Sequence, residues 1–128
     1  MNKKHTILIV DDEEAIIKIV SLILTNAGYD IIADSHADLH FLQTHIYPDL
    51  ILLDNQLGTK SGADICRQLK TNERTKHIPV MLVSATEGLS EIASYACADD
   101  FLPKPFDVET LLQKVDSLLT NTDMAAAC

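Results

Sequence analysis

The sequence predicts a doubly wound α/β fold, in which a five-stranded parallel sheet carries helices on both faces. Two observations lead to this prediction. Short apolar runs alternate five times with stretches of helical periodicity, a (βα)5 pattern typical of parallel sheets. The run Leu50–Leu53 is apolar at every position, as in a strand covered on both faces. A chain of 128 residues is long enough to bury one such core.

Each strand is predicted from a short run of β-branched or aliphatic residues bounded by polar or turn-forming residues. The five predicted strands span 6–10, 30–34, 50–53, 80–83 and 99–102. The second of them has an aspartate at each end, which favours a place at or near the edge of the sheet.

Each helix is predicted from apolar residues spaced three and four apart. The predicted helices span 13–27, 38–46, 63–71, 87–98 and 108–119. Gly28 ends the first helix because glycine adopts the left-handed cap conformation without steric cost. Pro48 closes the second, since the residue before proline avoids helical angles. Asp107 is placed to cap the last helix, and the stretch 87–98 is the weakest because of Gly88 and its many small residues.

Three apolar stripes are expected to face the core. They are Ile16, Ile19, Val20 and Ile23 in the first helix, Ile92, Tyr95 and Ala96 in the fourth, and Val108, Leu111, Leu112, Val115, Leu118 and Leu119 in the last. Residues 55–61 are expected to form a loop. The domain is expected to span residues 1–119, followed by a flexible C-terminal tail, 120–128.

Composition narrows the classes of function. Hydrophobic residues make up 47% of the chain and charged residues 23%, which is the balance of a folded globular domain. The formal net charge of −9 argues against binding to phosphate backbones or anionic membranes, which need clustered Lys and Arg. No apolar stretch approaches the roughly 20 residues that span a bilayer, and the N-terminus lacks signal-peptide features. We therefore expect a cytoplasmic domain.

Charged residues follow three of the predicted strands. Asp11 and Asp12 come directly after the first strand, Asp54 after the third and Lys104 shortly after the fifth. Right-handed crossovers place the carboxyl ends of parallel strands at one edge, which is where open α/β sheets bind ligands. We therefore expect the carboxylates and the ammonium to converge on one site.

Clustered carboxylates repel each other, and a divalent cation relieves that repulsion. Mg²⁺ suits the cluster because it prefers oxygen ligands, keeps some waters and accepts a phosphate oxygen. Soft metals do not suit it, since no Cys or His lies at a strand carboxyl end. A cation and an ammonium around an aspartate favour phosphoryl transfer, with the aspartate as nucleophile. Taken singly, each residue is better interpreted as a turn former, a helix cap or a solvated charge.

Four motifs in order carry a family resemblance. They are Asp11-Asp12 after the first strand, the run from Leu50 to Asp54 with Gly62 eight residues on, Val83-Ser84-Ala85 after the fourth strand, and the segment from Asp99 to Phe106. Over residues 5 to about 119 the chain resembles a response-regulator receiver domain of two-component signalling, similar to the single-domain chemotaxis type. The resemblance implies the flavodoxin-like strand order 2-1-3-4-5.

The resemblance also implies a role for each residue at the site. Asp54 is the phosphoacceptor, and Mg²⁺ is held by Asp11, Asp12, Asp54 and the main-chain carbonyl of Gln56. Lys104 and Ser84 contact the phosphoryl group, Phe101 is the switch aromatic, and the Lys104-Pro105 bond is cis. The chain departs from the family at Leu57-Gly58, where Met-Pro is usual, which removes no ligand.

The function implied is a phosphorelay receiver. It would take a phosphoryl group from a histidine kinase or a histidine phosphotransfer protein, and would catalyse only its own phosphorylation and dephosphorylation. The output surface would be the fourth helix, fifth strand and last helix, which would act on a downstream target or output domain. The main alternative is a pseudo-receiver that binds or dimerises without phosphorylation. An aspartyl phosphatase would need a carboxylate where Gln56 stands, and a flavodoxin-like cofactor binder would need a phosphate loop where Asp11 and Asp12 stand.

Overall fold

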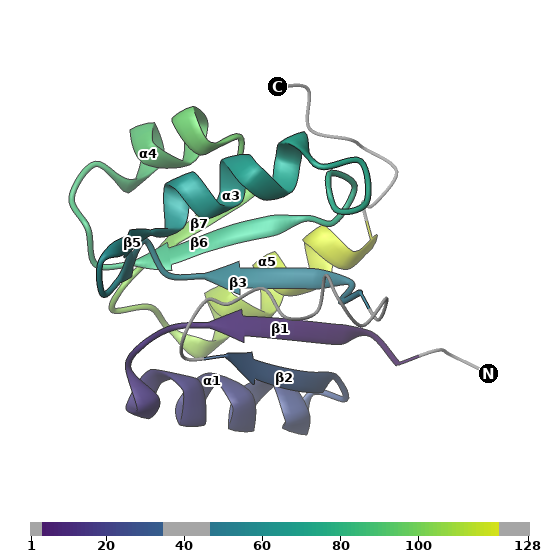
Figure 1. The fold of residues 1–128 in the computed structure, drawn as a ribbon. Helices are drawn as coiled ribbons and strands as arrows, with labels where there is room; N and C mark the ends of the chain where they lie inside the picture. The colour runs from purple at the N-terminus through teal and green to yellow at the C-terminus, as the bar shows by residue number, and fades with distance from the viewer. Residues whose placement is uncertain (1–3, 35–46, 121–128) are drawn as a thin grey trace.

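The computed structural model describes residues 4–34 and 47–120 and shows a parallel sheet between two layers of helices (Figure 1). The five strands of the sheet are in the order β2-β1-β3-β6-β7, and every neighbouring pair is parallel. Numbered along the sheet-forming strands alone, this is the predicted order 2-1-3-4-5. The predicted helix 38–46 and tail beyond residue 120 lie outside the described residues.

The strands agree closely with those predicted. They are β1 (Thr6–Val10), β2 (Asp30–Asp34), β3 (Leu50–Leu53), β6 (Val80–Ser84) and β7 (Asp100–Pro103). Residues 55–61 were predicted to form a loop, but they contain a short antiparallel hairpin. It is made of β4 (Gln56–Leu57) and β5 (Lys60–Ser61). The turn of this hairpin contains Gly58 at φ +63°, a conformation that costs glycine no steric strain.

Four helices lie within the described residues. They are α1 (Glu14–Asn26), α3 (Gly62–Thr71), α4 (Leu89–Ala96) and α5 (Val108–Thr120). Asp107 caps α5 as predicted, since its Oδ1 accepts a hydrogen bond from the backbone N–H of Thr110 at 2.6 Å. Helix α4 is shorter than its predicted range because it starts only after Gly88, which is left-handed at φ +70°. None of these helices is long and apolar enough to cross a membrane.

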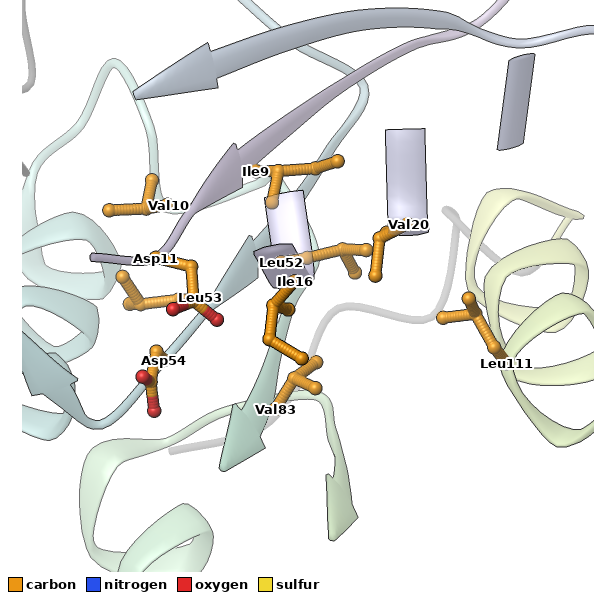
Figure 2. A pocket seen from close by; sticks show the side chains of 10 residues that line it. All are labelled: Ile9, Val10, Asp11, Ile16, Val20, Leu52, Leu53, Asp54, Val83 and Leu111. Carbon is orange, nitrogen blue, oxygen red and sulfur yellow. The ribbon is translucent and has the colours of Figure 1, made fainter. Parts of the chain in front are cut away.

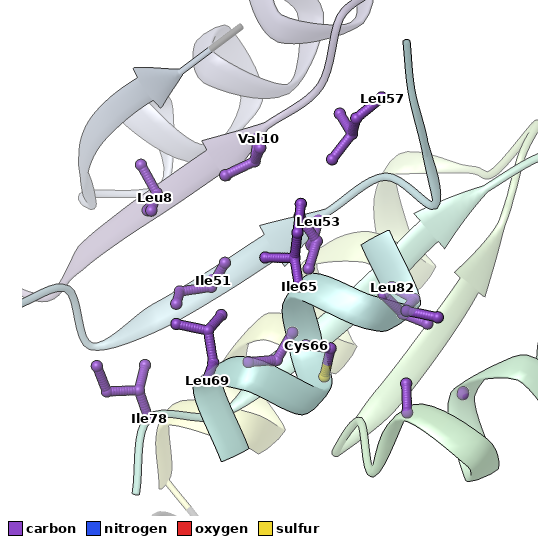
Figure 3. Close-up of a cluster of buried hydrophobic side chains, with 14 of the residues drawn as sticks. Leu8, Val10, Ile51, Leu53, Leu57, Ile65, Cys66, Leu69, Ile78 and Leu82 are labelled. Carbon is purple, nitrogen blue, oxygen red and sulfur yellow. The ribbon is translucent and has the colours of Figure 1, made fainter. Parts of the chain in front are cut away.

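The core has two halves because successive strand residues point to opposite faces of the sheet. On one face Leu8, Val10, Ile51 and Leu53 pack under α3 and α4. Figure 3 shows these strand residues facing Ile65, Cys66 and Leu69 of α3. On the other face, alternate residues of the same strands pack under α1 and α5, with Val20, Leu24, Leu111, Val115 and Leu119 buried. This buried sheet holds the strand ends that carry the charged residues.

Three residues predicted to face the core are exposed. Ile19 of α1 is 53% exposed, Tyr95 of α4 is 59% exposed and Val108 of α5 is 50% exposed. Helix α1 turns Val20 and Leu24 inward, which places Ile19 on the flank. Tyr95 instead lies under the guanidinium of Arg67 from α3, with Arg67 Cζ 4.7 Å from the ring centroid. Val108 is the first residue of α5.

A buried ion pair ties together the amino end of the sheet. Lys70 Nζ lies 2.6 Å from Asp99 Oδ2, and the two side chains are 9% and 14% exposed. The ammonium also donates to the carbonyl of Ile78 at 2.8 Å, while Asp99 Oδ2 accepts from the N–H of Val80 at 2.8 Å. The pair thus joins α3 to the starts of β6 and β7, at the edge opposite the acidic residues.

Candidate functional site

The acidic site is built where β1 and β3 end side by side. Val10 pairs with Leu53 in the sheet, so the residues that follow them leave the sheet together. The backbone N–H of Asp54 donates to the carbonyl of Val10 at 2.9 Å, which extends the pairing by one step. The side chains of Asp11, Asp12 and Asp54 therefore converge, and each offers an oxygen within 4.8 Å of the others.

Two of these carboxylates are deeply buried. Asp11 is 3% exposed and Asp54 is 5% exposed, whereas Asp12 lies at the surface. Backbone N–H groups hold the buried pair, since Glu13 donates to Asp11 Oδ1 at 2.9 Å and Gln56 donates to Asp54 Oδ1 at 3.3 Å. Beneath them lies a small hollow whose other lining residues are aliphatic, among them Ile16, Leu52 and Val83 (Figure 2).

Lys104 brings a positive charge to the carboxylates from the carboxyl end of β7. Its Nζ lies 2.9 Å from Asp11 Oδ2, 3.3 Å from Glu13 Oε1 and 3.6 Å from Asp54 Oδ2, and the side chain is 9% exposed. The backbone N–H of Lys104 donates to the carbonyl of Ser84 at 2.9 Å, which fixes the start of the loop. The Lys104–Pro105 bond is cis, as predicted.

The acidic side chains of the site carry more negative charge than Lys104 neutralises. Burial raises the pKa of Asp11, and this outweighs the hydrogen bond from Lys104 that lowers it. Burial alone would lower the pKa of Lys104, but the carboxylates of Asp11, Asp54 and Glu13 more than compensate and raise it. One ammonium thus pairs with three carboxylates, and a fourth acidic side chain, that of Asp12, lies beside them. A cluster of hard oxygen donors with uncompensated negative charge fits Mg²⁺.

The remaining predicted residues are Ser84, Phe101 and Gln56. Ser84, at the end of β6, is 1% exposed, and its hydroxyl lies 2.8 Å from the hydroxyl of Thr86. Phe101 on β7 packs partly buried against the core under α3 and α4. The ammonium of Lys114 lies 5.4 Å from the centroid of the Phe101 ring. Gln56 follows Asp54 by two residues, in the first strand of the β4–β5 hairpin.

Glu13 is the site residue that the sequence prediction missed. It was placed at the start of the predicted helix 13–27 but was given no role at the site, although its carboxylate reaches Lys104 across 91 positions of sequence. The available signal was its place directly after Asp11 and Asp12, at the start of a helix. N-cap positions favour Ser, Thr, Asp or Asn, so a glutamate at this position indicates a role other than capping.

Gly62 packs directly against the backbone of the proposed phosphoacceptor. A Cβ atom at Gly62 would lie 2.0 Å from the carbonyl oxygen of Asp54 and 2.8 Å from the Cα of Asn55. The N–H of Gly62 donates to the carbonyl of Asn55 at 2.8 Å, and Asn55 Oδ1 accepts from the N–H of Ala63 at 3.0 Å. The first turn of α3 can therefore approach Asp54 only because residue 62 has no side chain.

Substituting Gly62 by alanine is expected to lower the free energy of unfolding by about 2–3 kcal/mol, the cost of an overpacked contact whose partner is backbone. Urea unfolding followed by circular dichroism measures the loss. Gly58→Ala is the matched control, because Gly58 has positive φ but nothing within 4 Å of its Cβ position. That variant should lose about 1 kcal/mol through backbone strain alone. Equal losses in the two variants would contradict the close-contact explanation.

Comparison with known proteins identifies the family of the chain. The family model of the response regulator receiver domain matches residues 7–116. The chain belongs to the response regulator receiver family. The receiver is 42% identical over 120 residues to the DNA-binding dual master transcriptional regulator RpaA of Synechocystis, covering 91% of this chain and 50% of that protein. The chain thus spans about half the length of the curated relatives it matches.

Solved receiver structures share the fold. The BeF3-activated DrrB receiver domain is 30% identical, with a TM-score of 0.80 over 92% of this chain and 99% of that one. The receiver domain of the sensor histidine kinase PA1611 from Pseudomonas aeruginosa PAO1 is 21% identical, with a TM-score of 0.81 over 92% of this chain and 99% of that one. In that second structure a magnesium ion is coordinated in the active-site cleft.

Proposed function

We propose that this receiver domain accepts a phosphoryl group on Asp54, with Mg²⁺, as a step of a two-component phosphorelay. The observation that carries the proposal is the meeting of Asp11, Asp12 and Asp54 with Lys104 at one edge of the sheet. A pseudo-receiver has no use for this costly arrangement of buried charges, which is why we prefer the phosphoacceptor function. Membership of the response regulator receiver family supports the same choice.

The chemistry follows from the position of each group. Asp54 Oδ attacks the phosphorus of a donor phosphohistidine whose ring is protonated on its other nitrogen. The P–N bond breaks, and its electron pair stays with the ring, which leaves as neutral imidazole. Lys104 Nζ, 3.6 Å from Asp54 Oδ2, is placed to pair with a phosphoryl oxygen. Ser84 would donate its hydroxyl to another phosphoryl oxygen, after leaving Thr86. The product is an aspartyl phosphate, and the domain catalyses only its own phosphorylation and dephosphorylation.

Asp11, Asp12, Asp54 and the main-chain carbonyl of Gln56 would hold Mg²⁺. When bound, Mg²⁺ supplies charge neutralisation for the transferring phosphoryl group. The oxygen-only donor set supports this assignment, and a magnesium ion lies in the cleft of one receiver of the same fold. The burial of Asp11 and Asp54 limits competing contact with solvent.

Partners and output follow from the same proposal. A sensor histidine kinase or a histidine phosphotransfer protein would supply the phosphoryl group in the cytoplasm. The added charge would shift the Ser84 loop and Phe101, and would change the surface formed by α4, β7 and α5. A downstream protein or an output domain would recognise that surface. The relative RpaA is a DNA-binding transcriptional regulator, which makes a DNA-binding output one option for a longer chain.

Removing the metal is expected to prevent phosphorylation. Wild-type protein incubated with acetyl phosphate and Mg²⁺ should gain the mass of one phosphoryl group, and the same incubation with EDTA should give no gain. Intact-mass spectrometry at short times measures both, and peptide mapping after borohydride trapping should place the label on Asp54. A protein that folds and binds Mg²⁺ but gains no phosphoryl group would favour the pseudo-receiver.

A further inference from the structure

Glu13 occupies the start of α1 without acting as a helix cap. It is the N-cap residue, with φ −93° and ψ 107°, but its side chain makes no capping hydrogen bond. N-cap positions favour short polar side chains that can bond the N–H groups of the first turn. The side chain of Glu13 instead reaches the ammonium of Lys104, with Oε1 3.3 Å from Nζ. Glu13 therefore makes no capping hydrogen bond within its own helix and forms an ion pair with a residue distant in the sequence instead.

Lys104 is shared unequally between three carboxylates. Asp11 is closest at 2.9 Å, Glu13 follows at 3.3 Å, and the proposed phosphoacceptor Asp54 is the most distant at 3.6 Å. The glutamate side chain is 61% exposed, while those of Asp11 and Asp54 are 4% and 6% exposed. Of the three contacts, the one to Glu13 is therefore the easiest to exchange when another anion competes for the ammonium.

We propose that Glu13 is a positioning residue that holds Lys104 back from the phosphoryl site and so slows phosphorylation of Asp54. The inference rests on the proposed function of Asp54. A phosphoryl group must draw the Lys104 ammonium towards Asp54, and each contact that this movement weakens adds to the barrier. The Glu13 carboxylate acts twice in the same direction, because it pairs with the ammonium and its charge opposes that of the incoming phosphoryl group.

Glu13→Gln is expected to accept the phosphoryl group from acetyl phosphate about threefold faster than wild type at saturating Mg²⁺, the scale of losing an exposed ion pair. Its affinity for beryllofluoride, an analogue of the bound phosphoryl group, should rise by a similar factor. Glu14→Gln is the matched control, because it removes the same charge from the same helix start and Glu14 is exposed. Its rate should stay close to that of wild type.

Glu13→Ser separates this role from helix stability. Serine is a favourable N-cap, so this variant keeps or strengthens the helix start while removing the carboxylate. It should show the same threefold gain, with an unfolding midpoint in urea at or above that of wild type. Equal rates for Glu13→Gln, Glu13→Ser and Glu14→Gln, with wild type phosphorylated, would overturn this inference alone. A wild type that gains no phosphoryl group would overturn the proposed function, and this inference with it.

Discussion

Asp54→Asn is expected to abolish phosphoryl uptake from acetyl phosphate. An amide cannot form the acyl phosphate, and the other buried carboxylate beside Lys104, that of Asp11, is already paired with the ammonium at 2.9 Å. The substitution keeps the size and the planar shape of the side chain, so the loss should not come from misfolding. Intact-mass spectrometry of wild type and variant under identical Mg²⁺ concentrations measures the effect.

The same substitution should also change how the protein responds to Mg²⁺. Removing one of two buried carboxylates relieves repulsion with Asp11, so Asp54→Asn should unfold at a higher urea concentration than wild type in EDTA. Wild type should be stabilised by saturating Mg²⁺, by about 2.7 kcal/mol at a hundredfold excess over the dissociation constant. The variant should gain less. Asp64→Asn, at an exposed position of α3, is the control and should match wild type in both respects. Phosphoryl uptake by Asp54→Asn at the wild-type rate would contradict the assignment.

Asp99→Ala is expected to give the largest loss of stability, about 3–5 kcal/mol. The substitution leaves the Lys70 ammonium buried without its carboxylate and leaves the N–H of Val80 without its acceptor. Against a total of roughly 5–15 kcal/mol for a domain, this is a large fraction of the free energy of unfolding. Urea unfolding at neutral pH measures it.

Asp100→Ala is a matched control for this loss. Asp100 is the next residue and also pairs with a lysine, but its contact with Lys114 at 2.9 Å joins side chains that are 28% and 29% exposed. Removing it should cost about 1 kcal/mol or less. A double variant, Lys70→Met with Asp99→Leu, should recover much of the lost stability because no charge remains buried. Similar losses for Asp99→Ala and Asp100→Ala would show that burial of the Lys70 pair contributes little.

The fold could be predicted because its strands are simple. The apolar runs are short and separated by helical periodicity, so the strand bounds and the parallel pairing followed from them, while the strand order was implied by the family resemblance. Helix orientation was less predictable. Ile19 and Tyr95 have the spacing of inward residues, but the residues of these helices that are fully buried include Leu24 and Ala96 instead. Spacing alone does not say which of two adjacent apolar stripes will be buried when a helix has apolar residues on both.

The predicted acids of the site were brought together by the topology. Strand ends at Val10 and Leu53 are neighbours, so the acids that follow them had to meet. The positions of Glu13 and Thr86 relative to Lys104 and Ser84 could not be predicted, because both depend on side-chain torsions of loops rather than on strand register. The β4–β5 hairpin was missed for a similar reason. Two residues on each side are too few to show an alternating pattern.

The aliphatic hollow beneath Asp11 and Asp54 has a consequence for the lifetime of an aspartyl phosphate. Its other lining residues, such as Leu52, Val83 and Leu111, offer water no hydrogen-bond partner. A hydrolytic water would therefore have to approach from the side of Asp54 that faces away from this hollow. Side chains on that side, and not those of the core, would then set how quickly the signal decays.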